Sequence, residues 1–93
     1  MSAEHDRWIS VFLEAQAAEL GAAHNTRLAY GRDLLDFATW LDRKPQDFGD
    51  VDRAAIETYL IFCEAQGLSK ATRARRLSAI RQLFRFAFEE GWR

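Results

Sequence analysis

The apolar positions of the chain recur with the period of an α-helix in four segments. In the first segment, Trp8, Val11, Phe12 and Ala15 have the i, i+3, i+4, i+7 spacing of one helix face. Gly21 is a candidate C-terminal cap, so this pattern predicts a helix over about residues 5–20. No stretch of more than a few residues alternates as a half-buried strand does.

The second segment carries apolar residues on two sides. Asn25 is the predicted N-cap and Pro45 forbids continuation of the helix. The stripe expected to be buried consists of Tyr30, Leu34, Phe37 and Leu41. A second stripe, roughly opposite, consists of Leu28, Leu35 and Thr39. Such a helix either packs between neighbours or awaits a partner.

The third and fourth segments begin at residues that cap helices. Asp50 or Asp52 can cap the third helix, which Gly67 ends and whose core face is Ile56, Tyr59, Leu60 and Cys63. Ser69 can cap the fourth helix, which is expected to run to about Glu90, before Gly91. Its expected inward stripe is Leu77, Ile80, Phe84, Ala87 and Phe88. The short connections favour a compact, antiparallel-like all-α bundle of four main helices.

Length and composition limit the classes of protein to which the chain can belong. Its 93 residues, 48% of them hydrophobic and 29% charged, are enough for one domain over residues 1–93 and too few for a two-lobed enzyme. Cys63 is the single cysteine, and residues 1–20 carry charges throughout, so we expect no disulfide, no signal peptide and a cytoplasmic location. No run of about 18 uncharged apolar residues exists, so we expect no membrane span.

Charge is distributed unevenly along the chain. Residues 1–68 hold 6 basic and 12 acidic residues, whereas residues 69–93 hold 7 basic and 2 acidic ones. The stretch SKATRARRLSAIRQLFRF, residues 69–86, contains six lysines and arginines and no acid. A solvated helix usually mixes charges of both signs, so this stretch favours a polyanionic partner.

Helix geometry places small residues at the centre of the outward side of the fourth helix. Ala71, Ala74 and Ser78 would let the backbone approach a major groove. Around them stand long hydrogen-bond donors, namely Lys70, Arg75, Arg81, Gln82 and Arg85. An arginine fork can bond two acceptors at once, on guanine or on phosphate, so this face is typical of a helix that binds double-stranded DNA.

Other interpretations of the same residues stay open. Arg73 and Arg76 lie near the apolar stripe, where they can pack their stems and pair with acids of neighbouring helices. The chain can also be a protein-interaction module whose basic face meets an acidic partner and whose Leu28 and Leu35 meet a helix. A helix-turn-helix transcription regulator is a third reading, although no dimerisation segment is evident.

The chain offers few groups for catalysis. We expect His5 and His24 to be exposed, and Tyr30, Tyr59 and Cys63 to be packing residues. The acids of the middle of the chain are expected to form a solvated face or caps; they include Asp33, Asp36, Asp42 and Asp47. We therefore predict no catalytic residue, no metal site and no cofactor in this polypeptide.

Two stretches together resemble the N-terminal core-binding domain of the tyrosine recombinases, the phage-integrase family, and especially its bacterial Xer branch. They are NTRLAYGRDLLDFATWL, residues 25–41, and GLSKATRARRLSAIRQLFRFAFEEG, residues 67–91. The first stretch matches the family pattern at Thr26, Tyr30, Asp33 and Leu34. The second matches it at Thr72, Arg75, Arg76, Leu77, Ser78, Ala79, Ile80, Arg81, Leu83 and Phe84. One departure is Gly31, which stands where the family often has a larger, frequently basic residue.

The resemblance implies an orthogonal, SAM-like bundle that forms half of a clamp around DNA. The other half of the clamp, a C-terminal catalytic domain that needs no metal or organic cofactor, is expected to be absent from this chain. The implied phosphate contacts are Thr26 and Arg27, and the implied groove or backbone contacts are Arg75, Arg76, Ser78, Arg81 and Gln82. Helix geometry adds Lys70, Arg73 and Arg85. Partners would be a recombination-site duplex and other recombinase protomers, which the first helix helps to contact, in chromosome-dimer resolution or in a mobile element.

Overall fold

Four α-helices and one short 3₁₀ helix form the described part of the chain. The computed structural model describes residues 3–19, 23–44 and 46–93. The helices are α1 (Ala3–Glu19), α2 (His24–Asp42), α3 (Arg53–Ala65) and α4 (Lys70–Glu89), with the 3₁₀ helix η1 (Phe48–Asp50) before α3. The all-α prediction is therefore confirmed. The predicted roles of Gly21 and Pro45 fall outside the described residues.

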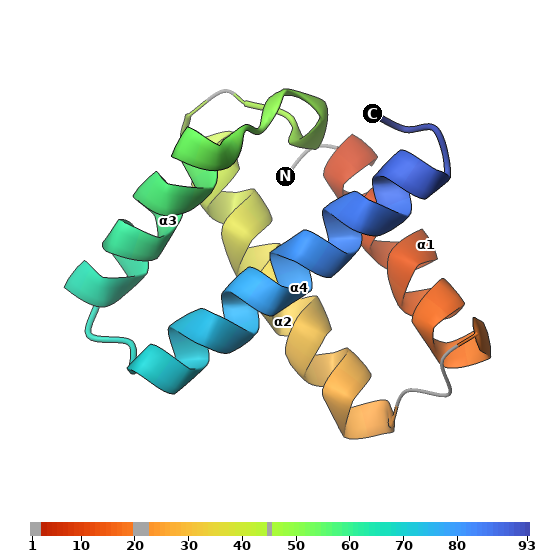
Figure 1. Cartoon of the computed structure of the whole chain (residues 1–93), viewed down its shortest axis with the longest axis horizontal. Helices are drawn as coiled ribbons and strands as arrows, with labels where there is room; N and C mark the ends of the chain where they lie inside the picture. The colour runs from red at the N-terminus through yellow and green to blue at the C-terminus, as the bar shows by residue number, and fades with distance from the viewer. Residues whose placement is uncertain (1–2, 20–22, 45) are drawn as a thin grey trace.

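The α4 helix contacts each of the other three long helices. It crosses over α2 in the middle of the molecule, while α1 and α3 lie on opposite sides of this crossing (Figure 1). The orthogonal bundle that the resemblance implies is thus the observed one (Figure 1), rather than the antiparallel-like bundle that the short connections favour. The crossing matters for function because it brings side chains of α2 against the basic helix.

The core is aromatic and centres on Phe37 of α2, which is fully buried. The ring of Phe37 lies 5.9 Å from that of Phe48 and 4.9 Å from that of Tyr59, measured between centroids. Trp8 of α1 and Phe84 of α4 also contact the ring of Phe48. Residues from all five helices therefore share one core.

Local capping residues fix the ends of α3 and α4 as predicted. The Asp52 side chain accepts a hydrogen bond from Ala55 N at 2.9 Å, and that of Ser69 accepts one from Thr72 N at 3.1 Å. Gly67 follows α3 with a φ of 84°, in the left-handed region that glycine adopts without strain. These side chains satisfy backbone groups that a helix end would otherwise leave unpaired.

The predicted N-cap of α2 is wrong. The helix begins at His24, its N-cap is Ala23, and no side chain caps it. Arg27 N bonds to Ala23 O at 3.1 Å, so Asn25 already lies inside the first turn. The start of α2 is thus not fixed by a capping side chain.

His5 is buried and not exposed as predicted. Its Nε2 atom accepts a hydrogen bond from Phe48 N at 3.2 Å, and its ring lies 4.1 Å from the Phe48 ring. Its Nδ1 atom lies 3.4 Å from Asp42 Oδ1. His5 therefore joins α1 to η1. His24 is exposed, as expected.

Gly31 has a packing role at the contact between α1 and α2. A Cβ atom at this position would lie 3.3 Å from Leu13 Cδ1. The missing side chain thus lets Leu13 pack against the α2 backbone, which offsets the low helix propensity of glycine. The opposite stripe of α2 has no such neighbour, since Leu28 and Leu35 are exposed.

Candidate nucleic-acid interface

The inward side of α4 consists of Ala79, Ile80, Leu83 and Ala87, all buried. The sequence predicted a stripe displaced to one side of this one, through Leu77, Ile80 and Phe84. Leu77 and Phe84 are only half-buried, and Phe88, predicted to face inward, is 75% exposed. The helix is therefore rotated relative to the prediction, and the rotation changes which arginines face the interior.

The outward side of α4 keeps the predicted combination of small residues and cations. Ala71 and Ala74 are exposed, and Ser78 is half-buried. Lys70, Arg81 and Arg85 are exposed as well. Among the described residues, these three cations have no carboxylate partner within ion-pair distance. This part of the helix thus carries positive charge that the fold itself leaves uncompensated.

Arg75 is partly held by α2. Its Nε and Nη2 atoms donate to Asp33 Oδ2 and Oδ1 at 2.8 and 2.9 Å, a bidentate pair. The Asp33 side chain is only 2% exposed, whereas that of Arg75 is 47% exposed. Hydrogen bonding to Asp33 raises the pKa of Arg75. The prediction that Asp33 belongs to a solvated face is therefore wrong.

Arg76 faces the interior, with 17% of its side chain exposed. It lies four residues before Ile80 and seven before Leu83, so it extends the buried stripe of α4. Its Nη1 atom donates to Asp36 Oδ2 at 2.6 Å and to the Tyr59 hydroxyl at 3.0 Å. The network of Arg76, Asp36 and Tyr59 joins α2, α3 and α4.

The fold raises the pKa values of both Tyr59 and Arg76. Burial, followed by the hydrogen bond to Asp36, raises the pKa of Tyr59 above its ordinary value of 10.0. Burial lowers the pKa of Arg76, but the interactions with Tyr59, Asp36 and Cys63 raise it by more. The tyrosine therefore stays neutral and the arginine charged, which is the state that the hydrogen bonds require.

Arg73 is also engaged within the fold. It donates from Nη1 to Leu68 O at 2.8 Å, and its Nη2 atom lies 3.7 Å from Glu64 Oε2 of α3. The alternative drawn from the sequence, that Arg73 and Arg76 pair with acids of neighbouring helices, describes both side chains. A DNA contact by either one stays a prediction.

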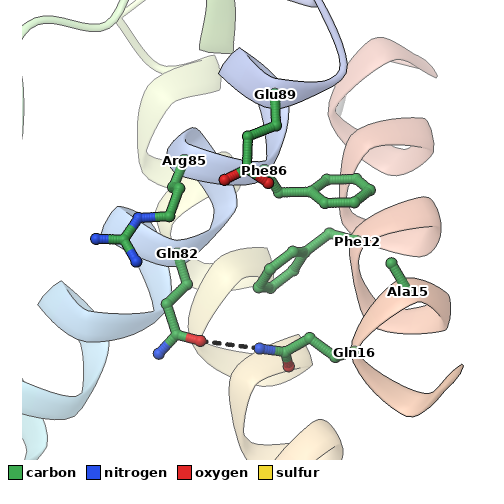
Figure 2. A pocket seen from close by; sticks show the side chains of 7 residues that line it. All are labelled: Phe12, Ala15, Gln16, Gln82, Arg85, Phe86 and Glu89. Atoms are coloured by element: carbon green, nitrogen blue, oxygen red, sulfur yellow. Dashed lines mark hydrogen bonds between the residues drawn. The ribbon is translucent and has the colours of Figure 1, made fainter. Parts of the chain in front are cut away.

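Gln82 connects α4 to both α1 and α2. Its Nε2 atom donates to the Tyr30 hydroxyl and to Ser78 Oγ, each at 3.1 Å, and its Oε1 atom accepts from Gln16 Nε2 at 2.9 Å. Figure 2 shows the bond to Gln16 at one end of the side chains that line a pocket of about 410 Å³ between α1 and α4. The pocket is lined by Phe12, Ala15, Gln16, Gln82, Arg85, Phe86 and Glu89.

The remaining two candidates lie in the first turn of α2. Thr26 is exposed and Arg27 is half-buried. The bond between Tyr30 and Gln82 shows that this half of α2 packs beside the middle of α4. Both helices can therefore contribute to one surface.

Two kinds of site lack support in the structure. In residues 3–19, 23–44 and 46–93, no group of three or more histidine, cysteine or acidic side chains could hold a metal ion. Over the same ranges, no helix is long and apolar enough to cross a membrane.

The side chains that sequence reasoning missed are Asp33 and Asp36, and their signal was the position of Arg76 on the buried stripe.

Comparison with known proteins identifies the family. The model of the phage integrase N-terminal SAM-like domain matches residues 9–91. The tyrosine recombinase XerD of Caulobacter vibrioides is 49% identical over 88 residues, and that of Brucella abortus is 44% identical over 85 residues. These matches cover 95% and 91% of this chain, but only 29% and 28% of the two relatives. No solved structure matches. The chain belongs to the phage integrase N-terminal SAM-like domain family.

Proposed function

We propose that the chain binds double-stranded DNA as the N-terminal domain of a site-specific tyrosine recombinase. The observation that carries the proposal is the outward face of α4, along which uncompensated Lys70, Arg81 and Arg85 lie on the same side as exposed Ala71 and Ala74. A major groove admits a helix whose backbone can come close, and DNA supplies the negative charge that this face lacks. The names of the relatives support the same proposal.

The candidate contacts fall into two groups, according to whether their side chains are already bonded within the fold. Lys70, Arg81, Arg85, Thr26 and Arg27 would contact phosphates, because their charges or hydroxyls are not committed to ion pairs among the described residues. Arg75 would reach the groove. The remaining candidates have side chains bonded inside the fold, and we propose that they support the surface: Arg73, Arg76, Ser78 and Gln82.

Strand cleavage would lie outside this domain. The chain spans 25–29% of the length of curated relatives that it matches. We propose that the intact protein is a recombinase whose catalytic residues belong to another domain, that protomers assemble on a recombination site, and that it acts in the bacterial cytoplasm. This domain would hold the duplex in register for that reaction.

Salt-dependent binding tests the proposal. The 93-residue chain is titrated against a fluorescent duplex that contains a bacterial recombination site, over a series of salt concentrations. If four to six phosphates are neutralised, log K should fall against log salt with a slope of roughly −4 to −5. Arg81→Ala and Arg85→Ala should each reduce the steepness of that slope by about 1.

Arg53 provides the matched control. It is an arginine on α3 whose side chain is 92% exposed, and it pairs with Glu57. Arg53→Ala removes the same charge from a different face and should leave the slope unchanged. Absence of binding at low salt would refute the proposal, and equal effects of all three substitutions would refute the assignment of this face.

A protein-interaction module is the second candidate, because Leu28 and Leu35 are exposed on one side of α2. This function predicts a stable complex with a helical partner and indifference to duplex DNA. The same titration separates the two candidates, since only DNA binding gives a steep salt slope with the duplex.

A further inference from the structure

Asp33 holds the guanidinium of Arg75 in one orientation. The carboxylate is 2% exposed and lies between α2 and α4, where Oδ2 and Oδ1 accept hydrogen bonds from Nε and Nη2 of Arg75. Arg76 Nε lies 3.5 Å from Oδ1 of the same carboxylate. Asp33 is therefore fixed from two sides, and the bidentate bond fixes the Arg75 fork in turn.

The pairing leaves one edge of the Arg75 fork available. A guanidinium has five N–H groups, and Asp33 accepts two of them. The parallel N–H groups of Nη1 and Nη2 at the tip are not used in this pair. With 47% of the side chain exposed, Arg75 can present this tip to a ligand while Asp33 holds its other edge.

The position of Arg75 on α4 favours a base over a phosphate. Ala71 lies one turn before it, Ser78 lies one turn after it, and Ala74 is its exposed neighbour. Small side chains beside Arg75 let this side of the helix approach the groove, so the tip can reach base edges. The O6 and N7 atoms of guanine accept two parallel N–H groups in the major groove.

We propose that Asp33 is a positioning residue that sets Arg75 to read a guanine in the major groove. The inference rests on the proposed binding of duplex DNA and adds the source of its base preference. Asp33 itself does not contact DNA. It limits the rotamers of Arg75 before binding, so that the fork meets guanine without a further loss of side-chain entropy.

The sign of the effect separates positioning from bulk electrostatics. Removing an acid beside a polyanion strengthens binding to every sequence when the acid acts only through its charge. If Asp33 positions Arg75, its loss instead lowers the preference for guanine while non-specific binding is retained or strengthened.

The experiment measures base preference directly. The 93-residue chain selects duplexes from a library with 20 random base pairs, and sequencing of the bound fraction gives the preference at each position. The wild type should prefer guanine at one or more positions of its site. Asp33→Asn should lower the preference at one of them roughly 5- to 150-fold, the effect of one bidentate contact. The salt slope on unselected duplex should not become shallower, because Arg75 keeps its charge.

Two further variants make the result specific. Arg75→Lys keeps the charge but removes the fork, and should lose the preference at the same position. Glu57→Gln makes the same change of charge as Asp33→Asn on an exposed part of α3 and should keep the preference. Circular dichroism verifies that each variant is folded. If Asp33→Asn does not fold, Asp33→Glu takes its place, since the longer side chain shifts the fork and should also lower the preference.

The outcomes are distinguishable. A wild type that binds no duplex at low salt refutes the proposed function and this inference with it. Binding with the expected salt slope but without guanine preference refutes this inference alone and makes Arg75 a phosphate contact. Guanine preference that persists in the folded Asp33 variant, or that Glu57→Gln lowers equally, also refutes it.

Discussion

The Tyr59 hydroxyl offers a sharp test of the network that fastens α4 to the core. Tyr59 is fully buried, and its O–H donates to Asp36 Oδ2 at 2.6 Å while accepting from Arg76 Nη1 at 3.0 Å. Tyr59→Phe removes the oxygen and leaves the ring, so packing against Phe37 is retained. The change therefore measures the polar contribution.

The expected loss follows from the partners of the hydroxyl. Hydrogen bonds to charged groups contribute about 1.5–3 kcal/mol to stability. Arg76 and Asp36 still contact each other at 2.6 Å, so no charge is left unpaired, and the loss should stay below the roughly 3–5 kcal/mol of a broken buried ion pair. For a domain of this size, the loss corresponds to a decrease of about 6–24 °C in Tm.

Tyr30→Phe is the matched control. Its hydroxyl accepts from the neutral amide of Gln82, a bond expected to contribute about 0.5–1.5 kcal/mol. Urea unfolding followed by circular dichroism gives the free energy of unfolding of both variants. A loss for Tyr59→Phe no larger than that for Tyr30→Phe would refute the conclusion that the charged partners of Tyr59 fasten α4.

Three further predictions concern stability. The fold raises the pKa of Tyr59 above 10.0, so the neutral hydroxyl contributes its full stabilisation below about pH 10. As the pH rises further, the free energy of unfolding should fall by about 1.4 kcal/mol per pH unit. Tyr59→Phe should remove this part of the slope in urea unfolding measured against pH. Ser69→Ala should cost about 1 kcal/mol in chemical denaturation, whereas Asn25→Ala should cost almost nothing; equal losses would contradict the assigned caps. Gly67→Ala should lower stability by about 1–2 kcal/mol, because its φ of 84° is unfavourable for alanine. A thermal melt should show Gly49→Ala to be milder, because an added Cβ meets no atom at either position but the φ of Gly49 is not in the left-handed region.

The sequence was most informative where the responsible physics is local. Asp52, one of two predicted caps, and Ser69 begin α3 and α4, and Gly67 and Gly91 follow these helices as predicted, with positive φ. A cap acts over three residues, so the chain around it is sufficient to define it. Asn25 shows the limit, because α2 begins one residue before it despite its good capping chemistry.

The rotation of α4 depends on contacts distant in sequence. Phe88 and Leu83 are both large and apolar, and the packing of α4 against α1, α2 and α3 decides that Leu83 is buried and Phe88 exposed. The same holds for Asp33, whose burial depends on Arg75, 42 residues away. His5 was more accessible to prediction, since it lies three residues before Trp8 and so continues the buried stripe of α1.

The contact between Trp8 and Trp92 affects the order in which the domain is completed during synthesis. Trp8 is fully buried, and its ring centroid lies 5.2 Å from that of Trp92, a residue 84 positions later in the chain. Trp8 also contacts Phe48, so α2 and η1 can cover much of the core side of α1 early, whereas the part under Trp92 is covered only after almost all of these residues have been synthesised. Until then one side of the Trp8 ring stays exposed, and Trp92 covers it last.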